Sequence, residues 1–112
     1  MQAEQDQNSN AAEVKQLLDL LQYQEDSIVS RVLLKNKGGT VTLFAFDEGE
    51  GLSEHTAPFD ALVINIEGEA TIGIAGENFH VKQGDTITLP ANRPHAVKAT
   101  TKFKMVLVMI KA

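Results

Sequence analysis

The sequence has no cysteine and no tryptophan, only one tyrosine, and three prolines in 112 residues. Without thiols the chain cannot form a disulfide framework, a zinc–thiolate site, an iron–sulfur cluster or a cysteine nucleophile. It also lacks an excess of basic residues, because ten lysines and arginines face fifteen acidic residues and give a formal net charge of −5. A phosphate backbone repels such a chain, which argues against nucleic-acid binding.

Long hydrophobic runs are also missing. The longest unbroken apolar run covers residues 105–110, far short of the roughly 20 residues needed to span a bilayer. The opening MQAEQDQNSN has neither the basic nor the apolar region of a secretory signal. With 43% hydrophobic and 22% charged residues, the composition is that of an ordinary globular domain. We therefore expect one small acidic domain that is cytoplasmic and has no membrane or nucleic-acid partner.

The first part of the chain carries a helical pattern. Residues 1–9 are polar and typical of a loosely held terminus. Asn10 and Glu13 form a capping-box pattern. Apolar side chains follow at helical spacing at Val14, Leu17, Leu18 and Leu21. The pattern predicts an amphipathic helix over residues 11–22 that packs against the core or a second subunit.

From residue 27 onward the hydrophobic period changes to two, and glycine or proline turns recur about every 8–12 residues. This predicts short strands over residues 27–34, 40–46, 60–66, 69–75, 78–81, 86–89, 95–98 and 103–110. The pattern indicates an all-β sandwich or barrel with a helical N-terminal extension. We expect residues 1–24 to form the polar terminus and amphipathic helix, and residues 25–112 to form the barrel.

Two of the three histidines lie where a functional site is expected. His55 and His95 stand beside rigid turn residues, where the mouth of a barrel would lie. Neutral imidazoles at such a mouth are natural ligands for a transition metal, or general bases. The alternative is two partly buried histidines that only hydrogen-bond to the backbone. His80 differs, because its neighbours Phe79 and Val81 take the inward face and leave it to solvent.

The spacing of glycines, prolines and histidines over residues 27–110 resembles that of the small single-domain cupins. The first cupin motif is matched at Gly49, His55 and Gly68, and the second at Gly84, Pro90 and His95. The resemblance implies an all-β, jelly-roll-like barrel, the double-stranded β-helix of RmlC-like proteins, with the N-terminal α-helix in front of it. It also implies a homodimer, because cupin relatives commonly dimerise. The interface would then be formed by residues 27–34 and the apolar stripe of the helix, acting as a docking arm.

Four motif positions depart from the family. In the first motif Ala57 replaces the second histidine and Ala61 replaces the glutamate. In the second motif Asn92 replaces a glycine and Ala99 an asparagine. Metal-binding cupins hold their ion with the two histidines and the glutamate of the first motif and the histidine of the second. The resemblance therefore carries over only two of four metal ligands.

Those two ligands are His55 and His95. Two imidazoles alone bind a divalent ion weakly, and a third ligand could come from Asp60 or Glu54. Strand alternation turns Asp60 away from the cavity unless a bulge follows Pro58. The candidate metal site is thus His55, His95 and Asp60, for one divalent transition metal such as Fe, Mn, Ni or Zn.

Besides a structural or interaction role through the dimer interface described above, two functions stay open. In the first, the barrel mouth binds a small molecule without robust catalysis, because small side chains widen and dry the pocket around a few polar contacts. Its candidate ligand-binding residues are His55, Ala57, Ala61, Asn65 and His95. In the second, the chain is a metal-dependent enzyme, an oxygenase or isomerase, whose ion activates oxygen or acts as a Lewis acid. A further alternative is that side chains simply fill the barrel, namely Phe46, Phe59, Phe103 and Met105.

Overall fold

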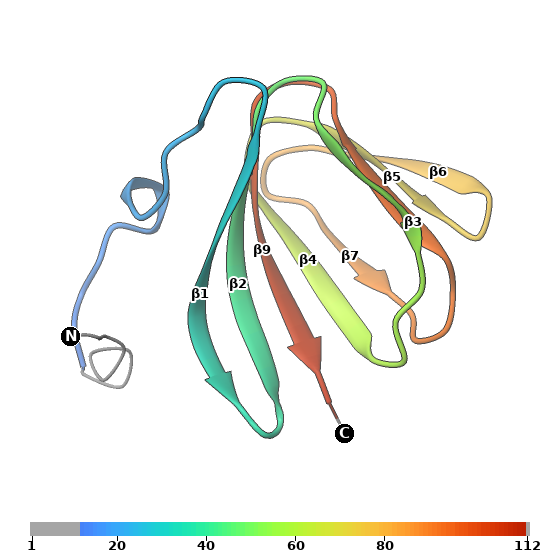
Figure 1. Cartoon of the computed structure of the whole chain (residues 1–112), viewed down its shortest axis with the longest axis horizontal. Coiled ribbons are helices and arrows are strands. Elements are labelled where there is room, and N and C mark those ends of the chain that lie inside the picture. Colours follow the sequence, from blue (N-terminus) through green and yellow to red (C-terminus); the bar gives the residue numbers. More distant parts are fainter. Residues whose placement is uncertain (1–11, 112) are drawn as a thin grey trace.

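The computed structural model describes residues 12–111. Nine strands follow one another along this part of the chain (Figure 1). They are β1 (Ile28–Asn36), β2 (Gly39–Phe46), β3 (Gly51–His55), β4 (Asp60–Glu67), β5 (Ala70–Ile74), β6 (Glu77–Val81), β7 (Thr86–Leu89), β8 (His95–Ala99) and β9 (Phe103–Ile110). The eight strands predicted from the period-two pattern are all present, and β3 adds a ninth between the acidic loop and His55.

The strands form two sheets. The five-stranded sheet has the order β1-β2-β9-β4-β7, and the four-stranded sheet has the order β3-β8-β5-β6. Every paired strand is antiparallel to its neighbour. Figure 1 shows the two sheets facing each other, with chain neighbours often assigned to different sheets. This confirms the expected all-β jelly-roll barrel.

The barrel core is built from the inward half of each strand's alternation. Phe46, Ile72, Phe103 and Met105 are among its largest fully buried side chains. The rings of Phe46 and Phe103 pack with their centroids 5.3 Å apart. Aromatic and methionine side chains therefore do fill part of the barrel. Phe59 is not among them, because it is only half-buried and lies beneath the Lys111 ammonium.

The helix predicted over residues 11–22 is wrong within the part that the structure describes. Residues 12–16 have no regular secondary structure, and only a single 3₁₀ turn forms, at Leu17–Asp19. Gln16 precedes the turn with an extended backbone and gives no side-chain cap. The proposed cap at Asn10 and the polar residues 1–9 lie outside the described residues. No helix in residues 12–111 is long and apolar enough to cross a membrane.

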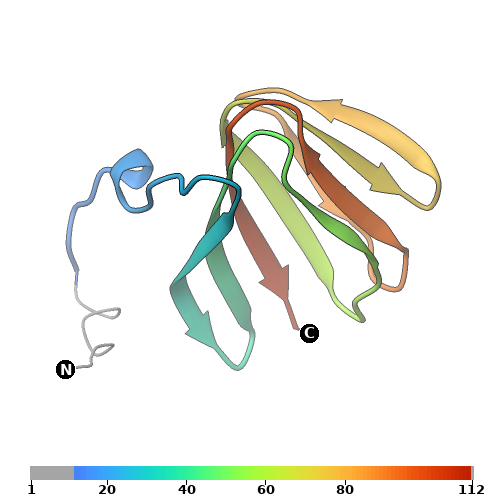
Figure 2. The ribbon, with the colours of Figure 1, turned by 45° about the horizontal axis from the view of Figure 1, so that its top comes forward.

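Side chains of the sheet hold this segment through its backbone carbonyls. Lys104 donates a hydrogen bond from its ammonium to the carbonyl oxygen of Leu18, at 2.7 Å, and Arg31 donates to that of Leu20, at 3.1 Å. A helix over residues 11–22 would use the Leu18 carbonyl for the amide of Gln22, so the contact with Lys104 competes with the helix, whereas the Leu20 carbonyl is among the last four that a helix leaves free. Residues 12–24, here called the N-terminal segment, therefore lie on the outer face of the five-stranded sheet, away from the four-stranded one (Figure 2).

Candidate functional site

A β-bulge brings His55 and His95 together. On β3, Leu52 pairs with Val97 of β8, but the next matched pair is His55 with His95, so β3 carries one extra residue over this stretch. A bulge of this kind re-aims the side chains that follow it. If the same chain continued in regular pairing from Leu52, Glu54 would stand opposite His95. The bulge at Ser53 and Glu54 therefore brings His55 into that position.

The two rings meet through their outer nitrogens. The Nε2 atoms of His55 and His95 lie 3.1 Å apart, and the ring planes cross at 70° with centroids 4.4 Å apart. Each inner nitrogen contacts a backbone carbonyl oxygen: His55 Nδ1 lies 2.8 Å from that of Ser53, and His95 Nδ1 lies 3.2 Å from that of Arg93. A carbonyl oxygen only accepts hydrogen bonds, so both Nδ1 atoms carry a hydrogen.

This arrangement fixes the chemistry of the gap between the rings. When both imidazoles are neutral, each has its single hydrogen on Nδ1, and both Nε2 atoms present lone pairs to each other. Burial lowers the pKa of His95, and the neighbouring His55 lowers it further, against an opposing effect of the hydrogen bond to Arg93. A lowered pKa favours the neutral ring. The gap therefore presents two lone pairs and suits a metal cation or a hydrogen-bond donor from a bound molecule.

The spacing of the two nitrogens also fits a shared metal ion. Two imidazole nitrogens bound side by side to one ion, each at about 2.0–2.1 Å, lie about 3 Å apart. The observed separation of 3.1 Å is that distance. Within residues 12–111, however, no group of three or more histidine, aspartate or glutamate side chains is placed to hold an ion. The described residues thus bring together two potential ligands and no third one beside them.

Asp60 does not join the histidine pair. It pairs with Ile110 of β9, and Ala61 follows directly opposite Met109, so no bulge turns its carboxylate inward. Its Oδ1 atom accepts a hydrogen bond from the backbone amide of Ala91 at 2.8 Å, and its side chain is exposed. The structure therefore brings together two of the three candidate metal ligands and leaves Asp60 on the outer face.

Ala57 and Ala61 stand at the same end of the barrel as the histidines. Ala61 is 9% exposed on β4, and Ala57 is half-buried with its carbonyl accepting from the amide of Asn92 at 2.7 Å. Asn92 has φ +64° and so adopts the left-handed conformation at the position where the second cupin motif has glycine. Asparagine tolerates this conformation better than most residues do, so the motif's turn survives the substitution.

Asn65 is at the other end of β4 from the histidines. It is 1% exposed, and its Nδ2 donates to the carbonyl oxygens of Gly68 and Val81 at 2.9 and 3.2 Å. Its Oδ1 accepts from the amide of Glu67 at 2.9 Å. The inward orientation expected from the sequence is correct, but these polar atoms are used within the fold, two of them by the β4–β5 turn and one by the end of β6. Asn65 is therefore not placed to contact a ligand held by the histidine pair.

His80 lies on the solvent face, as strand alternation indicates. Its Nε2 is 2.9 Å from a carboxylate oxygen of Glu69, in an exposed pair remote from the other histidines. Two features that shape the site could not be predicted from the sequence. These are the β3 bulge and the contacts with the carbonyls of Ser53 and Arg93, because every residue has a backbone carbonyl whatever its side chain. The sequence shows only that Arg93 precedes Pro94 and lies near His95.

Comparison with known proteins gives a consistent result. The family described as Cupin domain matches residues 42–111. A conserved protein of unknown function from Streptococcus pyogenes is 35% identical, with a TM-score of 0.86 over 91% of this chain and 90% of its own. A cupin superfamily protein from Desulfitobacterium hafniense is 27% identical, with a TM-score of 0.82 over 86% and 88% of the two chains.

A third solved structure is a Cupin 2 conserved barrel domain protein from Leptotrichia buccalis. It is 42% identical, with a TM-score of 0.81 over 84% of this chain, and this chain spans 46% of its length. No curated protein matches the sequence significantly. The comparisons therefore agree on a domain family without naming an activity.

Proposed function

Because the chain belongs to the cupin family, we propose that its barrel mouth binds a small molecule through the paired imidazoles of His55 and His95. One observation carries the proposal. Both Nδ1 atoms are held by carbonyl oxygens, so both Nε2 lone pairs point into one gap of 3.1 Å. Two acceptors aimed at the same place bind a group that brings positive charge or a hydrogen to donate, such as a hydroxyl or an ammonium group.

The surroundings of the pair support an otherwise apolar ligand. Across the strands, His95 pairs with Ile74 on one side, and Ala61 lies between Leu89 and Met109. Such a mix, in which many apolar side chains surround a few polar anchors, is typical of small-molecule sites. Ala57 and Ala61 leave room where the family motif has a histidine and a glutamate.

A second candidate function is a metal-dependent cupin enzyme. The distance between the two Nε2 atoms favours it, since 3.1 Å fits two ligands of one divalent ion. His55 and His95 would hold the ion, and it would supply Lewis-acid or oxygen-activating chemistry when bound. The described residues offer no third side chain beside the pair, so water or the bound molecule would have to fill the remaining positions. Because the ion would need ligands from outside the described side chains, the enzyme is the second candidate.

The two candidates separate in one experiment. We would purify the chain without an affinity tag or chelator and measure its metal content and melting temperature, alongside His55→Ala and the control His80→Ala. His55 is exposed, so its truncation should leave the fold intact. The binding function predicts little metal, and stabilisation of wild type and His80→Ala, but not His55→Ala, by small apolar amines or alcohols.

Other results would change the conclusion. Near one ion per wild-type chain, lost in His55→Ala and kept in His80→Ala, would establish the metal site in place of the binding function. If amines, alcohols and metals stabilise His55→Ala as well as wild type, the histidine pair is not the anchor, and both candidates fail.

A further inference from the structure

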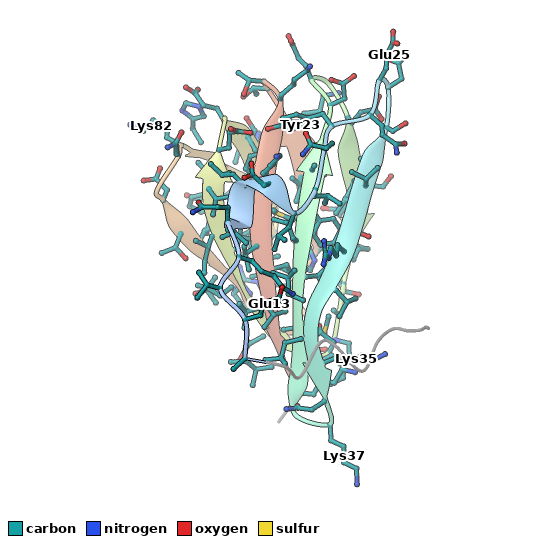
Figure 3. All side chains as sticks on the ribbon, turned by 90° about the vertical axis from the view of Figure 1, so that its left-hand side faces the viewer. Glu13, Tyr23, Glu25, Lys35, Lys37 and Lys82 are labelled. Atoms are coloured by element: carbon teal, nitrogen blue, oxygen red, sulfur yellow. The ribbon has the colours of Figure 1, made fainter. Side chains whose placement is uncertain are left out.

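The barrel mouth is accessible, in contrast to the apolar outer face of the five-stranded sheet. On that outer face Leu43, Ala45 and Val106 are buried, and the N-terminal segment lies across it (Figure 3). At the mouth His55 is exposed, whereas the ring that it contacts, His95, is 8% exposed. A molecule can therefore reach the histidine pair from solvent and become partly buried against it.

The Nε2 atoms of the pair accept hydrogen bonds and donate none while both rings are neutral. The single hydrogen of each ring is on Nδ1, where the carbonyl oxygen of Ser53 or of Arg93 holds it. Two acceptors thus face each other at 3.1 Å with no hydrogen between them. A bound group that brings one hydrogen satisfies one acceptor and leaves the other without a partner in a partly buried place, which is costly.

A nitrogen that brings two hydrogens can satisfy both acceptors at once. Placed beside the pair, at about 2.9 Å from each Nε2 atom, it sees the two acceptors about 65° apart. The two hydrogens of a tetrahedral nitrogen diverge by about 109°, so each lies about 20° off the line to its acceptor, which a hydrogen bond tolerates. A hydroxyl group has a single hydrogen and cannot make both bonds.

Positive charge on that nitrogen strengthens both bonds, because charged donors form hydrogen bonds about twice as strong as neutral ones. The charged side chains next to the pair in the chain, Glu54 and Arg93, are exposed and opposite in sign. Three lysines at the hairpin end of the five-stranded sheet are exposed or held over the Phe59 ring, namely Lys35, Lys37 and Lys111. Figure 3 shows the first two of these lysines in the β1–β2 hairpin, on the sheet opposite the histidines. The two lone pairs therefore determine the charge of the ligand, and they favour a cation.

We propose that the histidine pair selects an ammonium group with at least two N–H hydrogens, that is, a protonated primary or secondary amine on an apolar body. The inference rests on the proposed function and narrows its ligand class, because it separates these amines from alcohols and tertiary amines. The head group gives one hydrogen to each Nε2 atom, and the apolar body lies against Ala61, Leu89 and Met109, which are neighbours across three strands. A third hydrogen faces water on the side of the exposed His55.

The test compares ammonium compounds that keep one positive charge and lose N–H hydrogens one at a time. These are cyclohexylmethylamine and its N-methyl, N,N-dimethyl and N,N,N-trimethyl derivatives. Each is titrated into the full chain, freed of metal by a chelator, at pH 8, where ordinary imidazoles with a pKa of about 6.5 are neutral and alkylamines are protonated. We expect similar dissociation constants for the primary and secondary amines, and a constant about tenfold higher for the tertiary amine. Cyclohexylmethanol should bind no more tightly than the tertiary amine.

Two variants separate the count of hydrogens from the size of the head group. His55→Phe keeps a ring but leaves one acceptor, which a single hydrogen satisfies. Its affinity should therefore be lower overall, without the tenfold difference between the secondary and tertiary amines. The control His80→Ala removes an exposed histidine remote from the pair and should keep that difference. The primary and secondary amines serve as a second control, because they differ by a methyl group and both retain two hydrogens.

Other results would overturn the inference. A steady loss of affinity with every added methyl group, from primary to secondary amine included, would mean that the site responds to size. Equal binding of the secondary and tertiary amines would also overturn it, and if that binding still required His55, the proposed function would stand without it. If none of the compounds binds wild type more tightly than His55→Phe, the proposed function fails together with the inference.

Discussion

The side chain of Asn65 completes three hydrogen bonds inside the barrel, to Gly68, Val81 and Glu67. Asn65→Ala would leave their polar groups without a partner in a buried place. We expect it to lower the free energy of unfolding by about 3 kcal/mol, measured by urea denaturation. The control Asn78→Ala, at an exposed position of β6, should stay within about 0.5 kcal/mol of wild type. Equal losses at both positions would contradict this account.

Glycine at position 68 is required by a close contact as well as by backbone conformation. Gly68 has φ +82°, and a Cβ added there would lie 1.8 Å from the carbonyl oxygen of Lys102. Gly76 has φ +87° but no atom within 4 Å of such a Cβ. We expect Gly76→Ala to cost about 1 kcal/mol of backbone strain and Gly68→Ala about 3 kcal/mol or more. Thermal unfolding of the two variants measures the difference, and equal costs would mean that the contact relaxes freely.

Backbone conformations that depend only on neighbouring residues could be predicted from the sequence. Gly49, Gly68 and Gly84 all have positive φ, and glycine is the residue that adopts this conformation most readily. Asn92 keeps the turn at a motif glycine position for a related reason. Strand alternation predicts that Asn65 points inward. It does not predict the hydrogen bonds of the side chain, because two of them go to carbonyls of β6 and of the β4–β5 turn. A side chain's partners far along the chain leave no pattern in the sequence around it.

At the scale of elements, period-two alternation located eight strands within a few residues of their ends, because each strand buries one face. The same reasoning failed for the N-terminal segment. Its leucines fit helical spacing, yet Lys104 binds the carbonyl of Leu18, and the segment forms only a 3₁₀ turn with irregular flanks. Tertiary contacts overrode a weak local preference.

Tyr23 offers a direct measurement of how firmly this segment is held. Its hydroxyl donates to Glu67 at 2.5 Å, with the ammonium of Lys104 5.0 Å from the ring centroid. Burial raises the pKa of Tyr23, and the hydrogen bond to Glu67 and its charge raise it further. The folded chain therefore keeps a proton that the unfolded chain loses above about pH 10. This contribution to stability is complete below that pH and declines as the pH rises above it.

We therefore expect the phenolate absorbance of Tyr23, the single tyrosine of the chain, to appear only well above pH 10. Glu67→Gln should move this titration to lower pH, because the variant removes the charge that opposes ionisation. Tyr23→Phe should lower stability by about 1 kcal/mol at neutral pH and abolish the decline above pH 10. A wild-type titration close to that of free tyrosine would mean that the hydroxyl does not hold the segment.

At the scale of the whole molecule, the five-stranded sheet has apolar side chains on both faces, and the chain covers much of the outer one with its own N-terminal segment. Deleting residues 1–24 would expose Leu43, Ala45 and Val106. We expect a loss of about 3 kcal/mol or more, measured by urea denaturation, together with self-association in light scattering. Deleting residues 1–16 keeps the contacts of Leu18, Leu20 and Tyr23 and serves as the control. Similar losses for both deletions would contradict the role given to those contacts.

The family and the fold were accessible from motif spacing, since turn residues and strand alternation are local signals. The homodimer and the cytoplasmic location stay predictions, and light scattering of the full chain tests the first. The choice of His55 and His95 as site residues stays a prediction, although the structure brings their rings together. That contact could not be predicted, because it depends on how β3 and β8 align across the sheet.

That alignment includes one extra residue in β3, and this makes the site tolerant of a change in chain length. Deleting Ser53 or Glu54 would make the step from Leu52 to the histidine equal to the step from Val97 to His95, so regular pairing would still put the histidine opposite His95. In a strand without a bulge, the same deletion would bring a different residue opposite its partner. The strand that leads to this site can thus lose one codon and keep both nitrogen donors.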